Sequence, residues 1–130
     1  MRILVAEDDF ASRKFISKFL AKFGDVDITA DGAEAVEAFR YAVEDGEYYN
    51  LVCLDVMMPQ MNGIEALQQI REIEKSMAVP KEKRSNIIMT TALNEVSQVN
   101  AAFDYGCQGY AAKPIDTEAF EEVLKKMKLI

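Results

Sequence analysis

Polar side chains follow four of the five strand-like apolar runs in this sequence, at the point where each run ends. In chain order these side chains are Glu7, Asp8, Asp9, Asp55, Thr91 and Lys113. An acid that ends an apolar run must be paired when it is buried, because an unpaired buried charge is costly. Asp55, at the end of "NLVCLD", is therefore the residue that most needs an explanation.

This set of side chains suits metal-assisted phosphoryl chemistry. Crowded carboxylates raise one another's pKa, and a hard divalent cation such as Mg²⁺, held by one or two carboxylates, relieves that repulsion. A carboxylate can also attack phosphorus and form an aspartyl phosphate. The ammonium of Lys113 and the hydroxyl of Thr91 could then neutralise charge on the phosphoryl oxygens.

Each polar residue also has a structural explanation when it is taken alone. Asp9 is a good candidate for a helix N-cap, Thr91 for a turn residue, and Lys113 for a solvated surface lysine. The combination of all of them at strand ends favours a functional site.

The elements that must position these residues alternate between strand and helix. Strands are predicted at 2–6, 25–30, 50–55, 86–90 and 108–112. Apolar residues at helical spacing lie between and after them, including a stripe of Phe15, Ile16, Phe19, Leu20 and Phe23. Five helices are predicted. The first ends at Gly24, and the second runs from Asp31-Gly32 to Asp45-Gly46. The third opens with an Asn62/Glu65 capping box, the fourth is capped by Asn94 and runs from 95 to about 105, and the fifth is capped by Asp116 or Thr117.

Five strand–helix units predict an α/β, doubly wound five-stranded parallel sheet. Ligands of such folds bind beyond the carboxyl ends of the strands, where the polar residues fall. The polar segment 74–85 is expected to be a helix end followed by a surface loop. Its basic cluster at 81–84 is expected to be exposed to solvent.

Composition narrows the function further. The net charge of −7 argues against nucleic-acid binding. The chain has no histidine, which removes the commonest general base and metal ligand. Cys53 and Cys107 have no metal spacing and suit a reduced compartment. No apolar window is long enough for a membrane span and no signal peptide is evident, so we expect one cytoplasmic domain over 1–130 with no membrane partner.

Four motifs, "LVAEDD", "LDVMMPQMNG", "TTA" and "GYAAKP", resemble those of receiver domains of two-component response regulators, the CheY-like family. The resemblance spans residues 2 to about 127. It implies a flavodoxin-like (βα)5 fold with strand order 2-1-3-4-5. It also implies a phosphoacceptor in two-component (phosphorelay) signal transduction, which is not an enzyme beyond Mg-dependent self-phosphorylation and self-dephosphorylation.

The resemblance assigns roles residue by residue. Asp55 matches the phosphoacceptor, Asp8 a direct Mg²⁺ (or Mn²⁺) ligand and Glu7 a ligand through water, although "EDD" could also be aligned as Asp8-Asp9. The remaining matches are the main-chain carbonyl of Met57 as a metal ligand, Thr91 as the switch hydroxyl, Lys113 as the phosphoryl-binding lysine, Tyr110 as the aromatic that changes rotamer, and Pro114 after a cis peptide. Met57 and Leu93 are apolar where a polar side chain could orient water, which predicts slow self-dephosphorylation.

The implied partners are a histidine kinase or histidine phosphotransfer protein and a downstream effector protein or output domain, with a possible phosphorylation-dependent homodimer. The switch would change the surface of helix four, strand five and helix five. No output domain follows the last helix, so we favour a stand-alone regulator over a fragment. Three alternatives remain open. The first is a receiver-like module that acts without phosphorylation. The second is a dehalogenase-type aspartyl phosphatase, but such an enzyme needs a second acid two residues after Asp55, where this sequence has Met57, and the third is a flavodoxin-like FMN carrier, but the acids after strand one would repel the phosphate of FMN.

Overall fold

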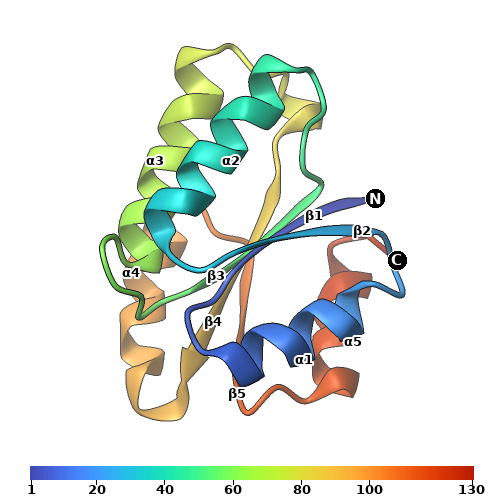
Figure 1. The fold of residues 1–130 in the computed structure, drawn as a ribbon, viewed down its shortest axis with the longest axis vertical. Helices are drawn as coiled ribbons and strands as arrows, with labels where there is room; N and C mark the ends of the chain where they lie inside the picture. The colour runs from blue at the N-terminus through green and yellow to red at the C-terminus, as the bar shows by residue number, and fades with distance from the viewer.

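A single parallel sheet in the order β2-β1-β3-β4-β5 forms the centre of the protein, with helices on both faces (Figure 1). The computed structural model describes the backbone of residues 1–130 and all side chains except those of Leu93, Asn94 and Val96. The elements in chain order are β1 (Arg2–Ala6), α1 (Phe10–Leu20), β2 (Asp25–Thr29), α2 (Gly32–Glu44), β3 (Leu51–Asp55), α3 (Gly63–Ser76), the 3-10 turn η1 (Lys81–Lys83), β4 (Asn86–Ala92), the 3-10 turn η2 (Leu93–Gln98), α4 (Val99–Asp104), β5 (Gly109–Lys113) and α5 (Thr117–Lys126).

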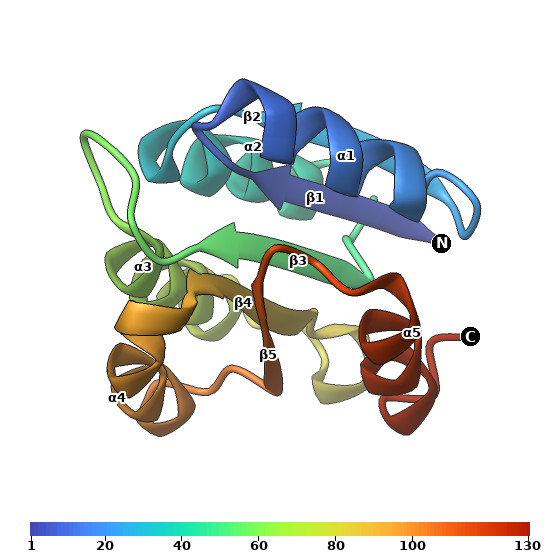
Figure 2. The same ribbon diagram turned by 90° about the horizontal axis from the view of Figure 1, so that it is seen from below.

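The strands bury both of their faces, as parallel sheets do. Alternate side chains of β1 enter different cores: Ile3 and Val5 pack with α1 and α5, whereas Leu4 and Ala6 pack with α2 and α3. Figure 2 shows this separation, with α1 and α5 on one side of the sheet and α3 and α4 on the other. The doubly wound α/β fold and the strand order 2-1-3-4-5 are therefore confirmed.

Helix starts follow the local sequence. Asp9, Asp31 and Asp116 are N-caps whose carboxylates accept backbone N–H groups, and Asn62 with Glu65 forms the predicted capping box. These bonds satisfy amides that a helix leaves unpaired at its first turn.

Three local expectations were wrong. Phe15 is 49% exposed rather than part of the buried stripe of α1, which ends at Leu20, before Gly24. The chain after β4 forms 3-10 turn η2 first, and α4 begins only at Val99. Asn94, expected to cap that helix, has a side chain outside the described part of the structure. Strand β4 runs to Ala92, two residues further than predicted, because its last residues pair with β5.

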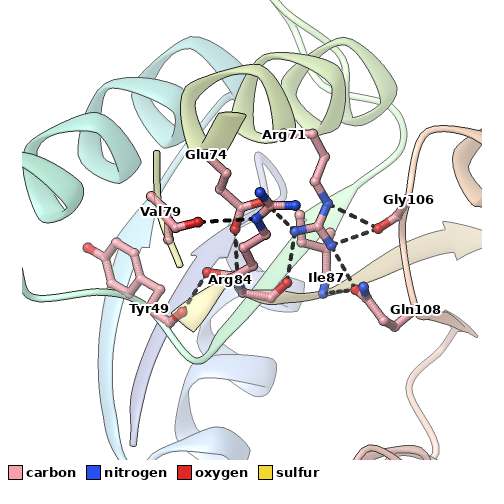
Figure 3. Close-up of polar contacts among 9 residues, drawn as sticks. Tyr49, Arg71, Glu74, Val79, Arg84, Ile87, Gly106 and Gln108 are labelled. Atoms are coloured by element: carbon pink, nitrogen blue, oxygen red, sulfur yellow. Dashed lines mark hydrogen bonds and ion pairs between the residues drawn. The ribbon is translucent and has the colours of Figure 1, made fainter. Parts of the chain in front are cut away.

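The segment 74–85 is held more tightly than its polar sequence indicates (Figure 3). Glu74 and Ser85 are both buried, and the Glu74 carboxylate accepts the backbone N–H of Ser85 at 2.8 Å. Arg71 lies beside them and donates to Glu74, to the carbonyl of Ser85 and to the carbonyl of Gly106. This arginine therefore joins α3 to the start of β4 and to the turn before β5.

No helix among the described residues combines the length and the apolar character needed to cross a bilayer.

Candidate functional site

Three carboxylates and one ammonium meet at the carboxyl edge of the sheet. Glu7 and Asp8 directly follow β1, Asp55 is the last residue of β3, and Lys113 is the last residue of β5. Asp55 pairs in register with Thr90 of β4, and Ala92 of that strand pairs with Lys113. Parallel pairing thus brings the ends of β1, β3, β4 and β5 to one edge.

Lys113 joins the two buried acids. Its Nζ lies 3.0 Å from Oδ2 of Asp55 and also contacts Oε1 of Glu7. The side chains of Glu7 and Asp55 are only 4% and 6% exposed, so the ammonium compensates charges that water barely reaches.

The pKa values reflect this crowding. Burial, together with the hydrogen bond and negative charge of Glu7, raises the pKa of Asp55 to about 8. Burial opposes the charged form of Glu7 too, but its hydrogen bonds with Asp55 and Lys113 outweigh burial and hold the pKa of Glu7 below its ordinary value. Burial disfavours the charged form of Lys113, but the two carboxylates outweigh this effect and raise its pKa.

The donor set fits a hard divalent cation. Glu7, Asp8 and Asp55 each offer a carboxylate oxygen, and these three oxygens lie within 4.8 Å of one another. All are the oxygen ligands that Mg²⁺ prefers, and the exposed Asp8 leaves room for the waters that Mg²⁺ retains.

Asp9 is not part of this group. Its Oδ2 accepts the backbone N–H of Ser12 at 2.9 Å, as the N-cap of α1. The carboxylates that cluster with Asp55 are those of Glu7 and Asp8.

The loop after Asp55 is shaped by close approach to α3. A side chain at Gly63 would place its Cβ 2.1 Å from the carbonyl oxygen of Asp55, so this helix start requires glycine. Met57 donates its backbone N–H to Oδ1 of Asp55 at 3.4 Å, and its side chain is 52% exposed.

Among the described residues, none of the side-chain hydrogen bonds or ion pairs of Asp55 involves Thr91 or Tyr110, the two expected switch residues. Thr91 is fully buried, and its hydroxyl donates to the carbonyl of Ala92 at 3.2 Å. Tyr110 is 42% exposed on β5. The Lys113-Pro114 peptide is cis. The side chain of Leu93 lies outside the described residues.

Sequence reasoning missed two polar features. Arg13 of α1 donates to the carbonyl oxygen of Glu7 at 3.0 Å and so ties that helix to the acidic end of β1. Thr90, on the opposite face of β4 from Thr91, is 3% exposed and lines a small void shared with Glu7 and Lys113. The pattern "TT" at the end of a strand was the only signal for Thr90.

The fold and the site define a doubly wound α/β protein with an acidic, lysine-paired cluster at its carboxyl edge. The family described as "Response regulator receiver domain" matches residues 3–125. The chain therefore belongs to this family, whose members occur in two-component response regulators and hybrid histidine kinases.

Individual relatives agree with this assignment. The chain is 33% identical to the response regulator MprA of Mycobacterium avium, covering 100% of this chain and 50% of that protein. It is 32% identical to the hybrid signal transduction histidine kinase L of Dictyostelium discoideum, covering 96% of this chain and 7% of that protein. The chain thus spans half or less of the length of these two curated relatives.

Among solved structures, a CheX-CheY-BeF3-Mg²⁺ complex from Borrelia burgdorferi is similar, with a TM-score of 0.82 and 25% identity over 98% of this chain and 89% of that chain. A CheY-like receiver domain protein from Methanospirillum hungatei matches with a TM-score of 0.78 and 25% identity over 98% of this chain and 92% of that chain.

Proposed function

We propose that Asp55 is the phosphoacceptor of this receiver domain. The observation that carries the proposal is the Asp55 carboxylate, which lies among Glu7 and Asp8 and is paired with Lys113 at 3.0 Å. We further propose that residues 1–130 act as one receiver and that a histidine kinase or phosphotransfer protein supplies the phosphoryl group. This phosphoryl transfer takes place in the cytoplasm. The chain performs no chemistry beyond its own phosphorylation and dephosphorylation.

In this reaction an oxygen of the Asp55 carboxylate forms a bond to phosphorus while the bond between phosphorus and the donor's nitrogen breaks. The nitrogen keeps the electron pair of that bond and takes a proton from water, and Asp55 becomes an acyl phosphate. Lys113 neutralises charge on the phosphoryl oxygens, since its ammonium already lies at Asp55.

Glu7, Asp8 and Asp55, with the main-chain carbonyl of Met57, would hold a Mg²⁺ ion. The ion would supply positive charge that lets a phosphoryl group approach this acidic edge. The same charge would favour the ionised form of Asp55, which is the nucleophilic form.

Phosphorylation adds about −1.5 to −2 charge and three strong acceptor oxygens. Thr91 would leave its bond to Ala92 and donate to the phosphoryl group, and Tyr110 would turn inward into the space that Thr91 vacates. The surface of α4, β5 and α5 would then change shape and bind a downstream effector protein or output domain. In thermodynamic terms the phosphoryl group shifts a balance between two conformations.

Incubation with Mg²⁺ and acetyl phosphate, followed by intact mass measurement, tests this proposal. We expect the mass of one phosphoryl group on the wild type and none on Asp55→Asn. Asp8→Asn should retain incorporation only at higher Mg²⁺ concentration, because it removes a ligand and leaves the acceptor. Wild-type incorporation by Asp55→Asn would move the acceptor elsewhere, and a wild type that takes up no phosphate would favour a module that binds partners without phosphorylation.

A further inference from the structure

The face of β4 that packs against α1 and α5 is apolar until its end. Ile88 belongs to the core cluster that also contains Val5, Ile16 and Cys53. Thr90 follows two residues later and so points to the same face. The residue is 3% exposed. Among the described residues, Ser17 Oγ is the side-chain oxygen that is sealed from water without a partner, so the Thr90 hydroxyl retains a little accessible surface and a water molecule can be its hydrogen-bond partner.

A small void lies beside this hydroxyl. Its polar lining consists of Glu7, Ser12, Thr90 and Lys113, and its volume is about 10 Å³. That volume is about what one water molecule requires, and buried waters bind where two to four polar groups converge. The void therefore meets both conditions for an ordered water.

Lys113 has a donor to spare for such a water. An ammonium group carries three N–H donors. Two of them have partners in Glu7 and Asp55. The side chain of Lys113 is only 22% exposed, and it lines the void together with Thr90. The third donor can be satisfied from the void, through a water that also binds the threonine hydroxyl.

We propose that Thr90 is a positioning residue for phosphoryl transfer: through one water in this void it provides the third hydrogen-bond partner of the Lys113 ammonium and holds that ammonium toward Asp55. The inference rests on the proposed function, since the held ammonium matters only if it neutralises a phosphoryl group. Thr90 pairs in register with Asp55 on the neighbouring strand, so its side chain lies beside the acceptor, but its hydroxyl acts on the phosphoryl group only through Lys113.

The substitution Thr90→Val removes the hydroxyl and keeps the shape of the side chain. We expect the maximal rate of phosphorylation by acetyl phosphate to fall about threefold to tenfold, the effect of losing one orienting hydrogen bond. The thermal midpoint should not fall, because valine suits the apolar face. Thr90→Ser restores the hydroxyl and should recover most of the rate.

A matched control is Thr29→Val. Thr29 is also a buried strand-end threonine, but its hydroxyl donates to the carbonyl of Val5 at 3.0 Å and does not line the void. This variant should lose some stability and keep the wild-type rate. A rate for Thr90→Val equal to that of the wild type would overturn the proposal, as would equal slowing of Thr90→Val and Thr90→Ser, since the shape of the residue would then be the cause.

A second measurement does not require phosphorylation. The ¹⁵N-detected ammonium signal of Lys113, assigned by its loss in Lys113→Gln, reports exchange of the Nζ protons with water. We expect exchange about threefold to tenfold faster in Thr90→Val than in the wild type or Thr29→Val. Unchanged exchange overturns the water-mediated contact even if the phosphoacceptor role of Asp55 holds. Failure of wild-type phosphorylation with changed exchange would instead reject the proposed function and leave the contact supported.

Discussion

Replacement of Arg71 by methionine should be among the most destabilising single changes in this protein. The guanidinium makes five hydrogen bonds: two to the carbonyl of Gly106 at 3.1 and 2.7 Å, and one each to Glu74 at 2.6 Å, the carbonyl of Ser85 at 2.9 Å and Gln108 at 3.0 Å (Figure 3). All five N–H donors of the arginine are therefore used.

The expected loss follows from burial. The side chains of Arg71 and Glu74 are 20% and 2% exposed, so methionine would leave the Glu74 carboxylate buried without its cation. Breaking a buried pair by removing one partner costs about 3–5 kcal/mol. Methionine fills much of the volume, so most of this loss reflects charge and hydrogen bonds.

Urea unfolding followed by circular dichroism measures this free energy. With a slope of about 2 kcal/mol/M, a loss of about 4 kcal/mol lowers the midpoint by about 2 M. Lys125→Met is the matched control, because Lys125 and Glu122 have the same i,i+3 spacing but are 57% and 65% exposed, at 3.7 Å. An exposed pair of this kind contributes about 0–1 kcal/mol.

The double variant Arg71→Met/Glu74→Met separates charge from packing. It should be less destabilised than Arg71→Met alone, because an apolar pair leaves no buried charge uncompensated. The reasoning is refuted if Arg71→Met lowers the midpoint no more than Lys125→Met does, or if the second substitution adds its full cost to the first.

Two further predictions concern the phosphorylated state and high pH. Met57 is apolar beside Asp55, so we expect the aspartyl phosphate of the wild type to last minutes or longer after removal of acetyl phosphate. Met57→Gln should shorten that lifetime about threefold to tenfold by offering a hydrogen bond to the attacking water, and a wild-type lifetime of only seconds would contradict this. Burial and the hydrogen bond to Asp27 raise the pKa of Tyr49 above its ordinary value. The unfolded chain therefore ionises this tyrosine first, and its stabilising contribution is present below about pH 10 and lost as pH rises above it. Thermal midpoints measured from pH 8 to 11 should fall less steeply in Tyr49→Phe than in the wild type, and parallel curves would disprove the assignment.

Local sequence determined most of the elements and the identity of the polar strand ends. Apolar runs at 2–6 and 50–55 form β1 and β3 within one residue of the predicted bounds, because a strand buried on both faces requires an unbroken apolar run. Asn62 and Glu65 cap α3 as predicted, because both halves of a capping box lie within one turn. The positions of Asp8, Asp55 and Lys113 at one edge then follow from parallel pairing.

The tertiary structure alone decided the contacts between residues far apart in the chain. Arg71 meets Gly106 across 35 positions, and no local pattern marks that pair, so the segment 74–85 looked loose although Glu74 and Ser85 are buried. Helix α4 begins at Val99, four residues later than the sequence predicted. In so short a helix the intrinsic helix propensity is weak, and tertiary packing overrides it. Thr90 and Lys113 line one void only in the folded protein, because that void lies where β1, α1, β3, β4 and β5 pack together.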